Sequence, residues 1–152
     1  MSDELKAVLS KADYEAVVEF KRKLSSELGD ALIEIKIFGS KVKKQDNLYS
    51  DLDIMIILDQ VDSHNKDLVF DIVVDINLKF DVVISPIIYS YPEFTNELFK
   101  ETYFYKATQN EGIDLSHSWP FLAQLGLVES NTVESAKDIL FQKKTSLNQI
   151  YL

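Results

Sequence analysis

The chain has 152 residues and no cysteine, which excludes disulfides, thiolate metal sites and a cysteine nucleophile. Its formal net charge of -9 argues against direct nucleic-acid binding, because such binders need a basic face to neutralise phosphates. No apolar run approaches the roughly 20 residues that cross a bilayer, and the acidic N-terminus lacks the basic start of a secretory signal. We therefore expect a cytoplasmic α/β protein that consists of one domain and has no membrane partner.

The first predicted element is an amphipathic helix over residues 11–28. Apolar residues recur in it at three- and four-residue spacing, with charged residues between them. Ser10 stands where an N-cap is expected, and Gly29 stands where a helix typically ends. The predicted buried stripe consists of Val17, Phe20, Leu24 and Leu28.

The next segment, residues 31–38, has the alternation of a β-strand. Isoleucines occupy one side, and Glu34 and Lys36 occupy the other. The dipeptide Gly39-Ser40 then ends the apolar run.

A second strand is predicted over residues 51–59, after the polar residues 41–49, which predict a short helical turn and a loop. This strand begins with Asp51 and Asp53, two residues apart. On a strand that spacing points both side chains to the same face, with Cα atoms roughly 6.5–7 Å apart.

Residues 66–78 fit either a helix or a strand. We favour a helix, because apolar residues form one stripe and the acidic residues share the opposite face. The alternative strand would make Asp71 or Asp75 a candidate for a third carboxylate beside the first two.

The third predicted strand covers residues 80–88. Asp81 lies at its start, and Pro86 indicates an edge position or the strand's end. Ser90 then begins a capping box that predicts a helix to about residue 109. Seven aromatic residues fall in this region, and we expect them to pack a helix onto the sheet, with base stacking as the alternative. They are Tyr89, Tyr91, Phe94, Phe99, Tyr103, Phe104 and Tyr105.

The segment from Gly39 to Asp53 carries the chemistry. Two carboxylates at strand spacing suit a divalent cation, most readily Mg²⁺, whose shell substrate phosphate often completes. Glycine lets a phosphate approach the backbone closely, and Ser40 adds a hydroxyl and backbone N–H groups. Lys41 and Lys43 follow, either as contacts to the outer phosphates or as a solvated loop. Gly-Ser and Asp-x-Asp are each common when they occur alone. Their order and ten-residue spacing are therefore more specific evidence for this chemistry than either motif.

In that order these residues resemble the signature of the minimal nucleotidyltransferases in the DNA polymerase β superfamily. The resemblance rests on Gly39, Ser40, Asp51 and Asp53, and it covers residues 12–112. It implies a nucleotidyltransferase-like mixed sheet of about three to five strands flanked by helices. We accordingly expect a domain over residues 1–112 and a helical C-terminal extension over residues 113–152.

The resemblance also implies a reaction. Asp51, Asp53 and, as a third carboxylate, Asp81 would bind two Mg²⁺ ions that hold ATP or another nucleoside triphosphate. A hydroxyl would then take a nucleoside monophosphate, most simply AMP, and pyrophosphate would leave. The phosphate-binding residues that it implies are Gly39, Ser40, Lys41 and Lys43.

Relatives of this kind often act as antitoxins beside a small helical HEPN-type protein, sometimes adenylylating it on tyrosine. The resemblance therefore implies such a partner, or a homodimer through the C-terminal helix; a small-molecule acceptor stays within the same class. The alternative is a non-catalytic module that neutralises a partner by contact. Two features favour it: Lys41-Val42-Lys43-Lys44 replaces the usual Arg-x-x-Gly, and the third carboxylate is the weakest match.

Overall fold

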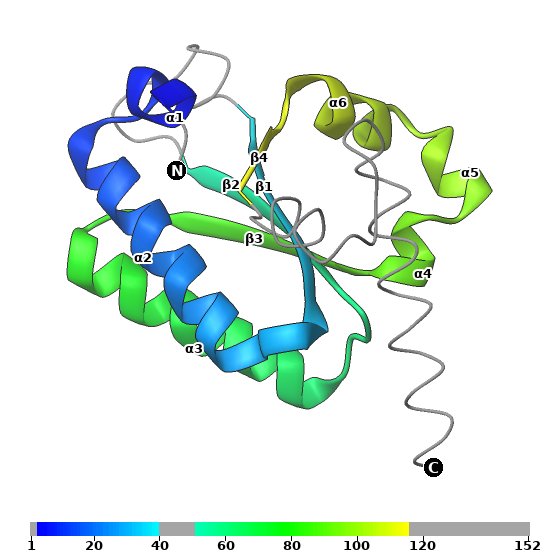
Figure 1. The fold of residues 1–152 in the computed structure, drawn as a ribbon, viewed down its shortest axis with the longest axis horizontal. Coiled ribbons are helices and arrows are strands. Elements are labelled where there is room, and N and C mark those ends of the chain that lie inside the picture. The colour runs from blue at the N-terminus through cyan, green and yellow to red at the C-terminus, as the bar shows by residue number, and fades with distance from the viewer. Residues whose placement is uncertain (1–2, 40–50, 116–152) are drawn as a thin grey trace, which may run out of the picture. The chain divides into compact units, whose positions relative to one another are not determined.

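The computed structural model describes residues 3–39 and 51–115 (Figure 1). The chain divides into two compact units, Met1–Leu115 and Ser116–Leu152. Most of the predicted extension over residues 113–152 lies outside the described residues, so its helix stays a prediction.

Four strands form one mixed sheet within the described residues: β1 (Leu32–Phe38), β2 (Leu52–Leu58), β3 (Ile84–Ser90) and β4 (Ile113–Asp114). Their order is β3-β2-β1-β4, with β1 antiparallel to both of its neighbours and β2 parallel to β3. A parallel pair needs a crossover, which the helix between β2 and β3 provides. The predicted α/β fold with a helix-flanked mixed sheet is confirmed, and β3, which contains Pro86, lies at an edge of this sheet.

β4 extends the domain past its predicted end at residue 112. Ile113 pairs with Ile37 on β1, and the Leu115 N–H donates to the Ile35 carbonyl at 2.8 Å. Leu115 is also buried, so the first unit continues to that residue. A two-residue strand is too short to show any alternation, so sequence periodicity does not predict β4.

Two long helices, α2 (Lys11–Leu28) and α3 (Ser63–Phe80), pack side by side on one face of the sheet (Figure 1). α2 has its predicted bounds: the Ser10 hydroxyl accepts the Asp13 N–H at 3.1 Å, and Gly29 ends the helix at φ 52°. The short α1 (Asp3–Val8), which precedes α2, was not predicted. Its six residues are too few to show a helical period.

The main core lies between these helices and the sheet. Alternate residues of β2 point into it, together with one stripe from each helix. The largest fully buried members of this core are Leu5, Phe20, Leu24, Ile35, Ile37, Leu52, Ile54, Ile56, Leu58 and Ile76. No helix in the described part of the chain combines the length and apolarity that crossing a membrane requires.

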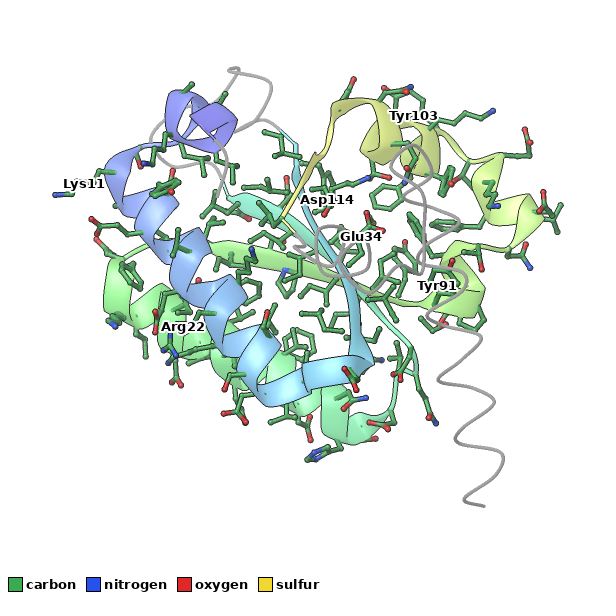
Figure 2. The ribbon with its side chains drawn as sticks, viewed as in Figure 1. Lys11, Arg22, Glu34, Tyr91, Tyr103 and Asp114 are labelled. Atoms are coloured by element: carbon green, nitrogen blue, oxygen red, sulfur yellow. The ribbon has the colours of Figure 1, made fainter. Side chains whose placement is uncertain are left out.

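The opposite face of the sheet is covered as well. Glu34 (Figure 2) and Lys36 are only 3% and 6% exposed, and the Lys36 Nζ lies 3.5 Å from the Glu34 Oε1. The Lys36 stem runs against Gly112, where an added Cβ would come 2.7 Å from the lysine Cγ. Alternation along β1 therefore places the two charges on one face correctly, but does not show that this face is buried.

Three short helices, not the single predicted one, follow β3. They are α4 (Tyr91–Phe94), α5 (Glu97–Lys100) and α6 (Tyr103–Glu111). The predicted capping box is present, since the Ser90 hydroxyl accepts the Glu93 N–H. The prediction of a single helix to residue 109 was wrong, because two further N-caps each begin a new helix.

Those two caps are the side chains of Asn96 and Thr102. The Asn96 carbonyl accepts the Leu98 N–H at 2.9 Å, and the Thr102 hydroxyl accepts the Tyr105 N–H at 3.2 Å. Such side chains compete with continued helical hydrogen bonding, so each ends one helix and begins the next.

The aromatic residues of this region pack onto the sheet, as expected. Phe104 of α6 meets Phe38 of β1 edge to face at 5.6 Å between ring centroids, and Tyr89 of β3 meets Phe99 at 5.0 Å. Tyr103 is the exception, since 81% of it is exposed at the start of α6 (Figure 2).

The helical interpretation of residues 66–78 is confirmed, and the strand alternative is wrong. The helix continues to Phe80, and Asp81 ends it in the left-handed conformation at φ 53°. The predicted strand over residues 80–88 therefore begins four residues too early, because Asp81 caps the helix and β3 starts at Ile84. Aspartate is one of the few residues that adopt this conformation readily.

Asn77 joins the end of α3 to the start of β3. Its side-chain oxygen accepts the Ile84 N–H at 2.9 Å, and its backbone oxygen accepts the Val82 N–H at 3.3 Å. We expect Asn77→Ala to lower the free energy of unfolding by about 1–2 kcal/mol, because it leaves the N–H of a buried residue unpaired. Urea denaturation would measure this; Asn110→Ala, an exposed change on α6, should stay within about 0.5 kcal/mol. Equal stability of both variants would contradict the role of the bond.

Candidate functional site

The bend after β1 lies against a carboxylate of β2. Phe38, the last residue of β1, is paired with Asp53 across the antiparallel ladder. Gly39 follows at φ 88°, a backbone conformation that L side chains rarely adopt. A Cβ added there would overlap the Asp53 Oδ2 and lie 3.2 Å from its Cγ. Only glycine fits, both for its backbone and for the space beside Asp53.

Asp51 and Asp53 stand at the entrance of β2, Asp51 exposed and Asp53 partly buried. Burial raises the pKa of Asp53, and the negative charge of Asp51 raises the same pKa further. Both causes disfavour a second negative charge at this place. A bound cation would reverse that balance, since it favours the ionised carboxylates.

Ser85 is the neighbour of Asp53 on the other side. In the parallel ladder between β2 and β3 these two residues are paired, and paired residues of neighbouring strands point to the same face. Ser85, Asp53 and Phe38 therefore lie in one row across the sheet, and Gly39 follows Phe38 along the chain. The sequence did not single out Ser85 as a site residue, because only the register places it there.

Asp81, the predicted third carboxylate, lies at the exposed C-terminal end of α3 and precedes β3. Within residues 3–39 and 51–115, no group of three or more acidic or histidine side chains is arranged to hold a metal ion. The described geometry therefore gives a pair of carboxylates on β2 and leaves the role of Asp81 a prediction. Asp71 and Asp75, the alternatives, lie on the exposed side of α3.

Three of the predicted phosphate-binding residues, Ser40, Lys41 and Lys43, lie outside the described residues. Their roles stay predictions. Gly39 is the one member of that set whose conformation is described.

The two carboxylates suit a magnesium ion that is shared with a substrate. Proteins usually hold Mg²⁺ through one or two carboxylates, and water and substrate phosphates complete its octahedron. Asp51 and Asp53 supply such a pair, and the missing side chain of Gly39 lets the Asp53 carboxylate lie directly against the backbone of the bend. The donor set fits Mg²⁺, and Asp51 and Asp53 are the side chains that would hold it.

The raised pKa of Asp53 predicts how metal-free stability depends on pH. Above the ordinary value of 3.8, the folded protein keeps this proton longer than the unfolded chain, so its ionisation costs stability. We expect the melting temperature of wild type, relative to Asp53→Asn, to fall as pH rises through the raised pKa and then to level off. Melting curves in chelator between about pH 4 and pH 7 test this. If the melting temperature of wild type instead rose relative to that of Asp53→Asn over this range, the raised pKa would be refuted.

Comparison with known proteins gives a sequence relative and a likeness to solved structures. No family model matches the chain. A protein of Methanocaldococcus jannaschii named "Putative protein adenylyltransferase" is 34% identical over 76 residues, which are 49% of this chain and 77% of that protein. A crystal structure of a toxin-antitoxin with AMP-PNP matches with a TM-score of 0.45 and 14% identity, over 87% of this chain and 86% of that one.

The sequence relative settles the family. Its identity exceeds 30%, and the match extends over most of its own length. The described fold agrees, with a mixed sheet flanked by helices that brings Gly39 against Asp53. This chain belongs to the minimal nucleotidyltransferases of the DNA polymerase β superfamily.

Proposed function

We propose that this protein is a Mg²⁺-dependent nucleotidyltransferase that moves AMP from ATP to a hydroxyl group of another protein. The observation that carries the proposal is the placement of Gly39, with its positive φ and missing side chain, against Asp53 at the entrance of β2. The name of the sequence relative, which refers to adenylyl transfer to protein, supports AMP as the group and protein as the acceptor.

The residues of the chain have distinct parts in this reaction. Asp51 and Asp53 would hold Mg²⁺, which would supply positive charge to the triphosphate, and the backbone of the bend at Gly39 would approach a phosphate beside them. The acceptor oxygen forms a bond to the α-phosphorus, the bond from that phosphorus to pyrophosphate breaks, and the hydroxyl proton is released. The protein's contribution is positioning and charge neutralisation, as in other phosphoryl transfers. Asp81 is proposed as a further carboxylate at the metal.

The test is a labelling experiment with the full-length chain. The chain is incubated with Mg²⁺, ATP labelled in its α-phosphate, and the protein encoded by its neighbouring gene, which for this family is expected to be a helical HEPN-type protein. Label that stays on a protein through a denaturing gel supports the proposal and identifies the acceptor. Substituting labelled GTP, CTP and UTP identifies the base. Absence of label with every nucleotide contradicts transfer to protein.

A non-catalytic antitoxin-like module is the second candidate. It is favoured by the absence, within the described residues, of a three-carboxylate cluster, since relatives are expected to use three acids. Such a module would still neutralise its partner by contact. It predicts that Asp51→Asn and Asp53→Asn neutralise the partner as well as wild type does, whereas an enzyme would lose this effect in both variants.

A further inference from the structure

The outward side of α3 carries a row of exposed apolar side chains. Phe70, Val74 and Leu78 stand four residues apart, which places them one above another on the helix. Of their surfaces, 48%, 54% and 80% are exposed. Single exposed apolar residues are ordinary on soluble proteins, but a contiguous row marks an interaction surface. We name Phe70, Val74 and Leu78 the α3 row.

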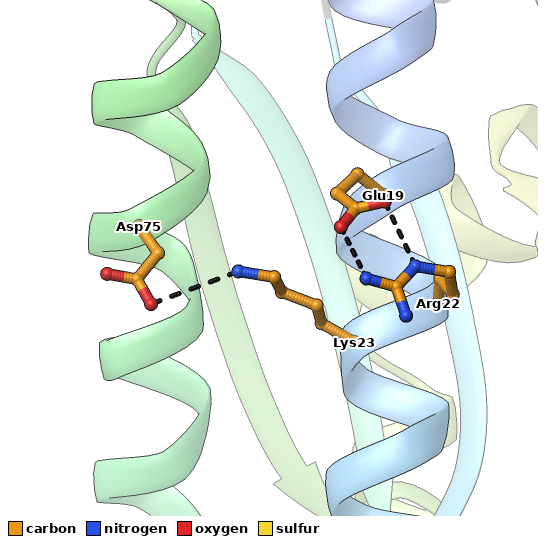
Figure 3. A network of polar contacts seen from close by, with 4 residues as sticks. All are labelled: Glu19, Arg22, Lys23 and Asp75. Carbon is orange, nitrogen blue, oxygen red and sulfur yellow. Dashed lines mark hydrogen bonds and ion pairs between the residues drawn. The ribbon is translucent and has the colours of Figure 1, made fainter.

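An acidic row with the same spacing lies directly beside the α3 row. Its members, all exposed, are Asp67, Asp71 and Asp75. Like charges four residues apart on a helix destabilise it, so the stability of α3 does not account for them. Of these three aspartates, only Asp75 forms an ion pair with another described residue, its Oδ2 lying 3.9 Å from the Lys23 Nζ of α2 (Figure 3). Neighbouring Arg22 is paired instead with Glu19, with 2.6 Å between the Arg22 Nη2 and the Glu19 Oε1.

We propose that the α3 row and the acidic row together dock a partner protein that presents an apolar strip bordered by lysine or arginine side chains. The apolar side chains would be buried against the strip, and the aspartates would face its basic border, which is the complementary arrangement for an interface. The chain's net charge of -9 adds long-range attraction for such a partner.

A second copy of this chain fits the surface less well. In a twofold-symmetric dimer, two α3 helices could pack antiparallel with their α3 rows in contact. The same side of each helix would then lie next to its own copy, as isologous contacts require. The acidic rows would then face each other, and like charges across an interface disfavour association. Charge thus selects a basic partner over self-association.

Docking on α3 would leave the site around Asp53 accessible. α3 packs on the sheet face that receives Leu52, Ile54 and Ile56, and Asp53 alternates with these residues, so it points to the opposite face. The inference therefore goes beyond the proposed function and does not depend on nucleotide transfer.

Two synthetic amphipathic helical peptides test the proposal with the full-length chain. Both carry the same leucine stripe, one bordered by lysines and the other by glutamates. We expect the lysine peptide to bind at least about tenfold more tightly than the glutamate peptide in fluorescence anisotropy, with affinity that falls as salt is added. Leu78→Asp should lower the affinity for the lysine peptide by about tenfold or more.

The matched control is Leu98→Asp on α5. Leu98 and Leu78 are 82% and 80% exposed, so neither variant is expected to unfold, and only Leu78→Asp should affect binding. Equal binding of the two peptides, or equal loss in the two variants, overturns the proposal. It is also overturned if Leu78→Asp alone dissociates a homodimer in sedimentation, which assigns the row to a second copy. A large fall in melting temperature in Leu78→Asp alone overturns it too, since the chain would then cover the row itself.

Discussion

Asp53→Asn should reduce AMP transfer by at least about 100-fold, the scale on which a single electrostatic contact to a reacting group acts. The change removes one negative charge from the pair that is proposed to hold Mg²⁺ and keeps the shape of the side chain. Mg²⁺-ATP should raise the melting temperature of wild type, because it binds only the folded state, and should leave that of the variant unchanged. The measurements are incorporation of α-phosphate label and thermal melting with and without Mg²⁺-ATP.

Two further variants make this result specific. Asp51→Asn removes the other carboxylate of the pair and should lose both signals as well. Glu15→Gln removes one exposed acid from α2, which packs on the sheet face opposite to Asp53, and should keep both. If Asp53→Asn retained most of the labelling, or if Mg²⁺-ATP stabilised it as it does wild type, the metal role of this residue would be wrong.

Gly39→Ala should abolish stabilisation by Mg²⁺-ATP and also lower stability by about 1–2 kcal/mol, the cost of holding a side chain at an unfavourable positive φ. The added methyl group would overlap the Asp53 carboxylate, so that carboxylate must move from the place where it is proposed to hold the metal. The melting temperature in chelator reports the loss of stability, and the shift of the melting temperature on adding Mg²⁺-ATP reports the loss of binding.

Gly29→Ala is the matched control for that change. Gly29 also has a positive φ, 52°, but a Cβ added there meets nothing within 4 Å. Gly29→Ala should therefore lower the free energy of unfolding by about 1 kcal/mol through backbone strain and keep the full response to Mg²⁺-ATP. If the two alanine variants lost the response equally, general destabilisation would explain it. If Gly39→Ala kept the response, the close approach to Asp53 would have no functional role.

The sequence predicted the long elements well because each is long enough to show its period. α2 and β1 emerged with bounds within a residue of those observed, and the helix over residues 66–78 was chosen correctly from its apolar stripe. Periodicity failed where tertiary contacts decide. The buried pair of Glu34 and Lys36 depends on a second layer of helices, which the alternation along one strand does not report.

The start of β3 shows a different limit. Asp81 was assigned to a strand because the apolar run begins beside it, yet the helix before it is long enough to include Phe80 and to end in a left-handed turn. The choice between a helix cap and a strand entry depends on Asn77, whose side chain binds the first N–H of β3. A hydrogen bond across seven residues leaves no trace in local pattern.

The site was predicted in part for the same reasons. Spacing alone indicated Gly39, Asp51 and Asp53, and the described geometry brings Gly39 against Asp53. Ser85 was missed because its nearness to Asp53 comes from the parallel register of two strands that are far apart in sequence.

The antiparallel ladder between β1 and β2 has one more consequence. It is this ladder, with Phe38 opposite Asp53, that sets where Gly39 meets the carboxylate, and the ten residues between Ser40 and Asp51 do not enter that pairing. Insertions or deletions in that stretch would leave the meeting point where it is, since loop closure costs change only slowly with length. Evolution and protein engineering can therefore change the length of that stretch without moving Gly39 away from Asp53.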